Sequence, residues 1–270
     1  MSDPSLCIDL EKIVNGRGGK GRVPGFVIRW GKNFIHQDFI NGFLEKGYEG
    51  VEFCDKCLEY LDVKINVEGM ENLDGFPEGT RFTFASNHPL GGIDGITLGK
   101  VFGKRFDGKI KYLVNDLLMN IKGLAPLCVP INKLGGQSRK LPALIDEAFR
   151  SDNQMIIFPA GLCSRKIDGR IQDIEWGKTF ITKSVQTGRY VVPVHFIGQN
   201  SKRFYNVARI CKALKFKFNI AMLFLPDEMI RGMHGSYTVK IGKPIPPEHF
   251  DSSRSAKEWA AYVRETVYNI

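Results

Sequence analysis

The stretch RFTFASNHPLGGIDGITLGKVFGKRFDGKIKYLVN (81–115) contains the pattern that decides the fold. Two short apolar runs, 81–86 and 109–115, have the length and composition of buried strands, and a helix-like segment near 94–104 separates them. A helix between two strands is typical of a parallel pair, because parallel strands need a crossover connection. This stretch therefore predicts an α/β unit.

The same alternation continues on both sides of this unit. Further strand-like runs lie at 63–69, 127–132, 154–159, 190–196, 218–225 and 237–242, and helix-like segments lie near 116–122, 140–150, 176–187, 203–213 and 254–268. Alternating strands and helices predict a mixed, largely parallel sheet flanked by helices. We expect this α/β domain to cover residues 63–270.

Residues 1–62 have a different pattern, which predicts an N-terminal helical appendage. Bulky apolar residues recur at helical spacing at Phe26, Trp30, Phe34, Ile35, Phe39 and Phe43, with Arg22, Arg29 and Lys32 beside them. Aromatic and basic residues on one amphipathic segment suit an anchor at an anionic membrane surface. Packing of the same stripe on the sheet is the alternative.

Composition excludes several classes of protein. The 270 residues carry a formal net charge of +9, with 43% hydrophobic and 25% charged residues, as in an ordinary globular protein. No apolar run approaches the 18 or so residues of a spanning helix, and the first residues do not resemble a secretory signal. The basic residues are scattered without a recognition motif, so we expect no nucleic-acid partner.

The six cysteines predict reduced thiols in the cytoplasm rather than a disulfide framework. Cys54 and Cys57 form one CxxC, but no second pair completes four zinc ligands. We therefore expect no metal, and we expect both thiols to pack on one side of a helix.

Two loops that follow strands could carry chemistry. In the first, NHPLGGIDG (87–95), His88 follows a strand and Asp94 begins a helix, a general-base arrangement; a helix cap with a first-turn acid is the alternative. In the second, IIFPAGLCSRK (156–166), a glycine turn can face an oxyanion and Arg165 and Lys166 can face an anion; a solvated surface loop is the alternative.

Both loops, in this order, resemble motifs of the glycerolipid acyltransferase superfamily, which includes lysophosphatidic acid acyltransferases. The family has Asn-His, four residues and Asp in the first motif, and Phe-Pro-Glu-Gly-Thr-Arg-Ser in the third. Between them, the segment 130–133 matches the second motif, and Val192-Pro193-Val194 matches a later strand. The resemblance covers roughly residues 60–245.

Three departures separate this chain from the common pattern. Five residues lie between His88 and Asp94, and a bulge at Gly91-Gly92 would keep the two in contact. Ala160 stands where the family has Glu, Leu162-Cys163 replace Thr-Arg, and Lys133 replaces the Arg of the second motif. The family uses the Glu and Arg positions around a phosphorylated acceptor, so the changes argue against a glycerol phosphate acceptor.

The two loops together look like a bacterial, hemolysin-related branch with O-acyltransferases that complete ornithine or glycine lipids. The resemblance implies that His88 takes the proton of a lysolipid hydroxyl while Asp94 orients it, and that Phe158–Gly161 stabilise the oxyanion. Acyl carrier protein or coenzyme A would supply the acyl thioester, with no bound cofactor, at the inner face of the cell membrane. The substrate-binding residues would be Asn87, Gly91, Gly92, Lys133, Phe158, Pro159, Ala160, Gly161, Ser164, Arg165 and Lys166.

Other functions remain open at this point. They are a 1-acylglycerol-3-phosphate acyltransferase, a thioester hydrolase, and a non-catalytic lipid-binding or hemolysin-like protein. Residues 76–81 read Phe-Pro-Glu-Gly-Thr-Arg, the family's third motif, but they precede His88. We interpret them as a turn between strands. Cys163 is a weak candidate nucleophile, and His195 is expected to be a core histidine.

Overall fold

The computed structural model of this chain describes residues 7, 11, 24–115, 118, 121–131, 141–214 and 223–270. Within them, a seven-stranded sheet has the order β1-β9-β8-β2-β5-β3-β4. Its strands are β1 (Lys64–Glu68), β2 (Phe82–Ser86), β3 (Ile110–Asn115), β4 (Cys128–Ile131), β5 (Gln154–Ile157), β8 (Tyr190–Ile197) and β9 (Ser236–Ile241). Only β8 and β9 pair antiparallel in this sheet. The prediction of a mixed, largely parallel sheet is confirmed.

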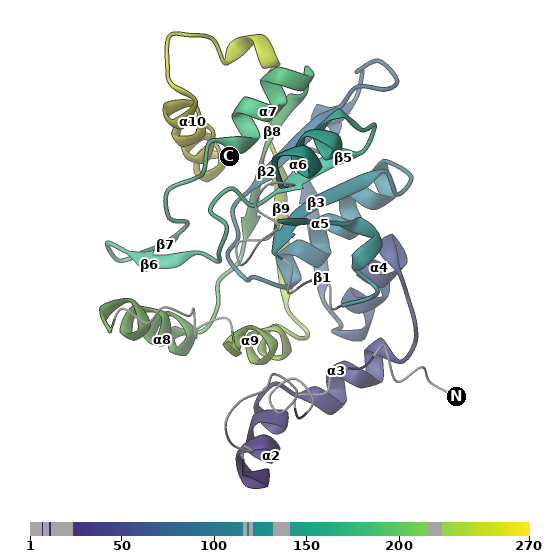
Figure 1. Cartoon of the computed structure of the whole chain (residues 1–270), viewed down its shortest axis with the longest axis vertical. Coiled ribbons are helices and arrows are strands. Elements are labelled where there is room, and N and C mark those ends of the chain that lie inside the picture. Colours follow the sequence, from purple (N-terminus) through teal and green to yellow (C-terminus); the bar gives the residue numbers. More distant parts are fainter. Residues whose placement is uncertain are drawn as a thin grey trace.

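Helices cover both faces of the sheet (Figure 1). One face carries α4 (Gly50–Tyr60) and α5 (Ile93–Arg105), and the other carries α6 (Leu141–Arg150), α7 (Thr179–Thr187) and α10 (Ala256–Asn269). The helices α2 (Gly25–Phe34), α3 (Gln37–Leu44), α8 (Lys202–Ala213) and α9 (Leu225–Arg231) lie at one end of the sheet. Short 3-10 turns lie at Met70–Leu73, Ala125–Leu127 and Pro247–His249. The helices predicted near 94–104, 140–150, 176–187, 203–213 and 254–268 correspond to α5, α6, α7, α8 and α10.

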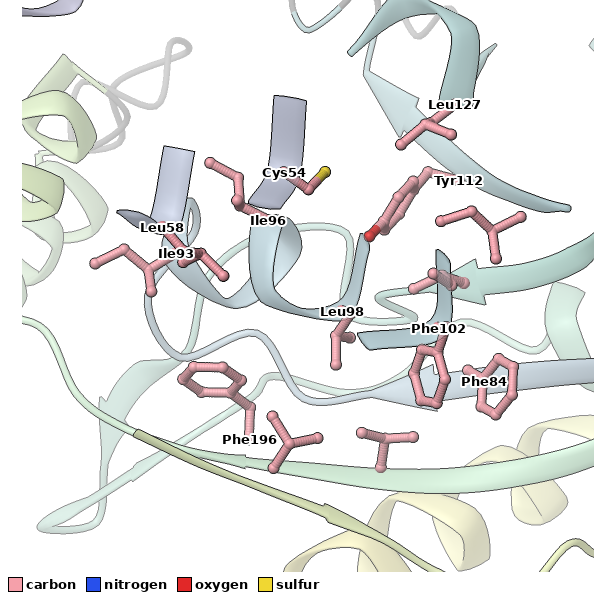
Figure 2. Close-up of a cluster of buried hydrophobic side chains, with 14 of the residues drawn as sticks. Cys54, Leu58, Phe84, Ile93, Ile96, Leu98, Phe102, Tyr112, Leu127 and Phe196 are labelled. Atoms are coloured by element: carbon pink, nitrogen blue, oxygen red, sulfur yellow. The ribbon is translucent and has the colours of Figure 1, made fainter. Parts of the chain in front are cut away.

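The core has two layers because successive residues of a strand point to opposite faces of the sheet. Phe84 of β2 lies in the cluster that α4 and α5 cover, and its ring stacks on that of Phe102 with centroids 3.7 Å apart. Figure 2 shows this cluster, where Cys54 and Leu58 of α4 meet the inward side of α5. The next residue of β2, Ala85, lies in the second cluster, under α6, α7 and α10.

Burial explains the cysteine pair. Cys54 is 0% exposed and Cys57 is 5% exposed, and both belong to the cluster under α4. Burial raises the pKa of Cys57 to about 12, so this thiol stays protonated at neutral pH. The two cysteines pack as predicted.

Three segments differ from the prediction or lie outside the described part. Of the strand expected at 218–225, residues 218–222 are not described, 223–224 form a 3-10 turn, and Leu225 begins α9. A short apolar run does not distinguish a strand from a helix. Most of the helix expected near 116–122 is not described, and 121–124 form a bend and turn. A hairpin of β6 (Arg165–Ile167) and β7 (Arg170–Gln172) occupies the loop expected after 164.

The N-terminal stripe divides between the core and the surface. A left-handed residue, His36 with φ 53°, separates α2 from α3, so the stripe is not one continuous helix. Phe43 is buried in the cluster that contains Phe84, and Phe39 packs against that cluster. Phe26 and Trp30 are instead 75% and 67% exposed. The core also includes α4, so the packing shows no break at residue 62.

No helix among the described residues has the length and apolar character needed to cross a bilayer.

Candidate active site

The site forms where β2 and β5 end. These neighbouring parallel strands pair Ala85 with Ile157, so the segments that follow them leave the same edge of the sheet. There, the rings of His88 and Phe158 stack with centroids 4.0 Å apart and an interplanar angle of 26°. The fold therefore brings the two predicted loops into direct contact.

His88 and Asp94 form the predicted pair. The Nδ1 of His88 lies 2.9 Å from Oδ2 of Asp94, although five residues separate them. Gly91 makes the contact between His88 and Asp94 possible because its φ is 77°, a backbone conformation that residues with a Cβ rarely adopt. A Cβ at Gly91 would lie only 2.3 Å from Sγ of Cys163, so the turn also requires glycine for space.

The carboxylate of Asp94 is fully buried and bound on both oxygens. Its Oδ2 also accepts the N–H groups of Leu90 (2.9 Å) and Gly91 (3.1 Å), and its Oδ1 accepts the N–H of Gly95 (2.9 Å). Burial raises the pKa of Asp94, but His88 and these N–H groups outweigh it and hold the pKa below its usual range. Asp94 is therefore a fixed anion that orients the imidazole.

The same contact sets the charge of His88. Burial lowers its pKa, and the nearby cation of Arg165 acts in the same direction, but Asp94 and then Asp173 outweigh them. The net pKa of His88 is raised, which is the shift expected of a base that must accept a proton. With Nδ1 bound to Asp94, Nε2 is the nitrogen left for that proton.

The segment 158–166 turns sharply after β5. The N–H of Gly161 donates to the carbonyl oxygen of Phe158 (2.9 Å), so in this conformation it does not face a substrate. Pro159 and Ala160 are half-buried beside it, and the Pro159 carbonyl accepts the N–H of Gly177 (2.9 Å). Any oxyanion contact in this turn must come from its other N–H groups.

The two basic residues after this turn differ in exposure. Arg165 is half-buried, donates to the carbonyl oxygens of Cys163 (2.7 Å) and Ser164 (3.2 Å), and lies over the ring of Phe204. Lys166 is exposed on β6. Lys133 lies outside the described residues.

Two residues predicted to bind substrate have their polar groups engaged within the protein. The side-chain amide of Asn87 donates to the carbonyl oxygen of Phe196 (2.9 Å) and accepts the N–H of the same residue (2.7 Å), which ties the end of β2 to β8. Ser164 is 1% exposed and its hydroxyl donates to Asp173 (2.5 Å). Both contacts brace the backbone around His88.

The Phe-Pro-Glu-Gly-Thr-Arg segment at 76–81 lies at the opposite end of β2. Residues 76–81 precede that strand, and His88 follows it. The side chain of Arg81 donates to the carbonyl oxygens of Arg150 (3.2 Å) and Thr187 (2.7 Å), while Glu78 is exposed. The segment is a connection between elements, as interpreted from its position.

Three other histidines have partners outside the His88–Asp94 pair, and Cys163 lacks the properties of a nucleophile. His36 pairs with Asp227 and His234 with Asp62, while His195 is half-buried and lies 3.4 Å from the carbonyl oxygen of Ile270. Burial raises the pKa of Cys163 to about 12, which leaves it a protonated thiol. These properties do not fit a nucleophile.

Sequence reasoning missed Asp173. It follows β7 and is fully buried, and it contacts both predicted loops. In the sequence it stands in the polar stretch RIQDIEW, which gives no sign that the carboxylate points inward.

At the strand edge, half-buried His88 is paired with buried Asp94 and stacked on a Phe-Pro turn, an arrangement that can act as a general base toward a hydroxyl group. The chain belongs to a family of acyltransferases, whose sequence model, described as "Acyltransferase", matches residues 17–270. The expected resemblance is thus confirmed at the level of the family.

Two curated relatives extend over the whole chain. A lyso-glycine lipid O-acyltransferase from Phocaeicola vulgatus is 52% identical, with all of this chain and 98% of the relative covered. A second protein of that name, from Bacteroides thetaiotaomicron, is 54% identical, with 100% of both chains covered. The crystal structure of the 1-acyl-sn-glycerophosphate acyltransferase PlsC from Thermotoga maritima matches with a TM-score of 0.50 and 17% identity, over 95% of this chain and 86% of that one. At that identity it supports the fold alone.

Proposed function

We propose that this acyltransferase moves a fatty acyl group from an acyl thioester to the hydroxyl of a lyso-amino-acid lipid, with lyso-glycine lipid as the acceptor. The contact between His88 and Asp94 carries the catalytic part of this proposal. The two relatives of that name, more than half identical over 98% and 100% of their lengths, support the acceptor.

In the proposed reaction, Nε2 of His88 accepts the proton of the acceptor hydroxyl as its oxygen attacks the thioester carbonyl carbon. Asp94 stabilises the imidazolium that forms. The carbon–sulfur bond then breaks, the thiolate leaves and takes up the proton, and the products are an ester and a free thiol. The acyl donor in this proposal is a fatty acyl thioester of acyl carrier protein or of coenzyme A.

Charge near the site suits an acceptor with an anionic head group, and a carboxylate is one such group. Arg165 lies close enough to His88 to affect its pKa, and Ala160 places no negative charge in the turn. The carboxylate of a glycine lipid can therefore approach this edge and meet a cation.

We also propose that the chain docks on the inner face of the cell membrane through one end of the molecule. Phe26 and Trp30 of α2 are exposed there, and α8 adds Ile210 (52% exposed) and Leu214 (63%) just beyond its end. Arg203, near the start of α8, lies over the ring of Phe34 at the end of α2, 5.4 Å from its centroid. Figure 1 shows both helices at the same end of the molecule. The exposed cations Arg29, Lys202 and Arg209 flank these side chains.

The energy of this contact is sufficient for reversible binding. Each basic residue near an anionic surface contributes about 1 kcal/mol, so three contribute roughly 3 kcal/mol, and buried apolar area adds to this. Such docking would present the acceptor, which a long acyl chain holds in the bilayer, to a site built on the sheet.

An acceptor panel tests the reaction. Purified protein would receive acyl carrier protein or coenzyme A thioesters with lyso-glycine lipid, lyso-ornithine lipid or lysophosphatidic acid, and mass spectrometry would identify the products. We expect acylated glycine lipid to form fastest. Faster acylation of lysophosphatidic acid would overturn the acceptor, and equal acyl release without any acceptor would identify a thioester hydrolase.

Vesicle co-sedimentation tests the docking. The double variant Phe26→Ser, Trp30→Ser should stay folded and lose binding to anionic vesicles. The matched control is Ile174→Ser, Val185→Ser, which changes two exposed apolar residues (36% and 40%) outside the proposed docking end, one of them on α7, and should bind like the wild type. Retained binding by the Phe26, Trp30 variant would remove these residues from the membrane face.

A further inference from the structure

A second buried carboxylate lies behind His88. Oδ1 of Asp173 accepts the backbone N–H of His88 (3.3 Å) and the hydroxyl of Ser164 (2.5 Å), and Oδ2 accepts Nε1–H of Trp176 (2.9 Å). Three donors therefore share one carboxylate that is fully buried. Both carboxylate oxygens of Asp173 therefore have partners. Burial raises the pKa of Asp173, and the bonds from Ser164, Trp176 and the N–H of His88 act in the opposite direction.

These bonds close a ring between the two loops of the site. The backbone N–H of Ser164 donates to the carbonyl oxygen of His88 (2.8 Å), while Asp173 holds the N–H of His88 and the hydroxyl of Ser164. The backbone of His88 is thus held on both its polar groups. Loss of Asp173 would leave one of these two attachments.

The C-terminal helix holds Asp173 in turn. The backbone N–H of Asp173 donates to the hydroxyl of Tyr268 (2.7 Å), and the carbonyl oxygen of Asp173 accepts Nη2–H of Arg264 (2.6 Å). Trp176, 2% exposed, belongs to the core cluster under α7 and α10. The carboxylate is therefore anchored in the rigid part of the fold and not in the loops that it joins.

We propose that Asp173 is a positioning residue of the acyl-transfer site, which fixes the imidazole of His88 relative to the turn at Phe158 by tying the His88 backbone to Ser164 and Trp176. This inference rests on the proposed function. It assigns Asp173 no contact with substrate and no proton transfer.

The charge of Asp173 affects the pKa of His88, and a residue with a purely structural role would not change that pKa. The charged groups that face His88 are Asp94 from α5, Asp173 ahead of α7, and Arg165 from β6. Asp173 itself faces His88, Ser164, Trp176 and Tyr268, and the guanidinium of Arg264 binds its backbone carbonyl. It also affects the pKa values of Cys163 and His195. Because Asp173 helps to raise the pKa of His88, removal of its charge should lower that pKa.

The experiment compares Asp173→Asn with the wild-type protein over a range of pH. A small misplacement of a catalytic group costs up to about 100-fold in rate, so we expect kcat to fall roughly 10–100-fold with KM for the thioester little changed. The acid limb of kcat/KM should move to lower pH, since His88 must be neutral to act as a base. A folded variant with kcat within about threefold of wild type and an unmoved acid limb would overturn the proposal.

A second variant covers the case in which Asp173→Asn does not fold. Trp176→Phe keeps the packed ring and removes only the donor to Oδ2, so it should lower kcat less than Asp173→Asn while it stays folded. If this variant also retained the wild-type rate and pH profile, the proposal would fail. The matched control is Asp55→Asn, which removes a carboxylate paired with Lys100 and Lys104 of α5 and should leave the acid limb unchanged.

A titration separates this inference from the proposed function. The pKa of His88 can be followed by NMR in protein with labelled histidine, without any substrate. A downward shift in Asp173→Asn supports the inference even if no lysolipid is acylated. An unchanged His88 titration refutes its electrostatic part whatever the activity.

Discussion

Replacing Gly91 with alanine tests whether the tight turn between His88 and Asp94 holds the pair together. The new Cβ would lie 2.3 Å from Sγ of Cys163 and 2.9 Å from Cδ2 of Leu225. The residue would also keep φ at 77°, where a Cβ meets the following carbonyl oxygen. The turn must either accept this strain or move.

The loss of stability follows from the left-handed backbone conformation and from the close contacts of the new Cβ. A left-handed conformation costs a residue with a Cβ about 1–2 kcal/mol, and overpacking in a filled region costs about 1–3 kcal/mol. We therefore expect the free energy of unfolding to fall by roughly 2–5 kcal/mol, which lowers Tm by roughly 4–9 °C in a chain of this size. Because the N–H of Gly91 donates to Asp94, a shifted turn should also reduce the rate of acyl transfer by at least tenfold.

The double variant Gly91→Ala, Cys163→Ala separates the two terms. Removal of Sγ relieves the closest contact but leaves the left-handed conformation. We expect partial recovery of Tm and activity, with a coupling energy of about 1–3 kcal/mol between the two positions. The assays are thermal unfolding and initial rates of acyl transfer, with Cys163→Ala alone as the control.

Two results would refute this reasoning. If Gly91→Ala had wild-type stability and rate, the turn would not be as tight as the structure shows. If the double variant were as impaired as Gly91→Ala, the contact with Cys163 would not be the source of the strain. A large loss of activity in Cys163→Ala alone would instead reopen its role as a nucleophile.

Two further predictions concern the residues of the site. His88→Ala should reduce kcat by about 10²–10⁴-fold. Asp94→Asn should lower the rate and move the acid limb of the pH profile to lower pH, because the raised pKa of His88 depends on the Asp94 carboxylate. Near-normal turnover of a His88→Ala enzyme that circular dichroism shows to be folded would contradict the assignment. Glu78→Ala should leave kcat/KM within a few-fold of wild type, whereas Arg165→Ala should raise KM for acceptor or donor by roughly tenfold, because it removes a charge-assisted contact. If Glu78→Ala and Arg165→Ala were equally impaired in steady-state assays, the segment 76–81 would belong to the site.

Much of the sheet could be predicted because its central strands are continuous apolar runs. Every described residue of β2 and β5 is buried, and both runs end in short polar or glycine-rich segments. The pair of His88 and Asp94 could be predicted because local spacing and a glycine turn decide it. Of the run predicted as a strand at 218–225, only 223–225 are described, and these three residues are a 3-10 turn and the start of α9, because an apolar run alone does not separate a strand from a helix.

The bracing contacts could not be predicted because they depend on tertiary structure. Asn87 binds the backbone of Phe196, 109 residues away, and Asp173 binds the backbone of His88 from 85 residues away. The chemistry of an amide or a carboxylate is the same whether it faces a substrate or a distant backbone. Only the fold decides which of the two it meets.

The way in which the N-terminal helices join the core determines where the protein can be shortened. Phe43, Leu44, Phe53, Leu58 and Leu61 are all buried in the cluster under the sheet. At about 1.5–3 kcal/mol for each such side chain, they contribute roughly 8–15 kcal/mol, as much as the whole stability of a typical domain. A truncated enzyme that lacks residues 1–62 should therefore be insoluble, whereas a truncation before Gln37 removes Phe26 and Trp30 and keeps every one of these core side chains.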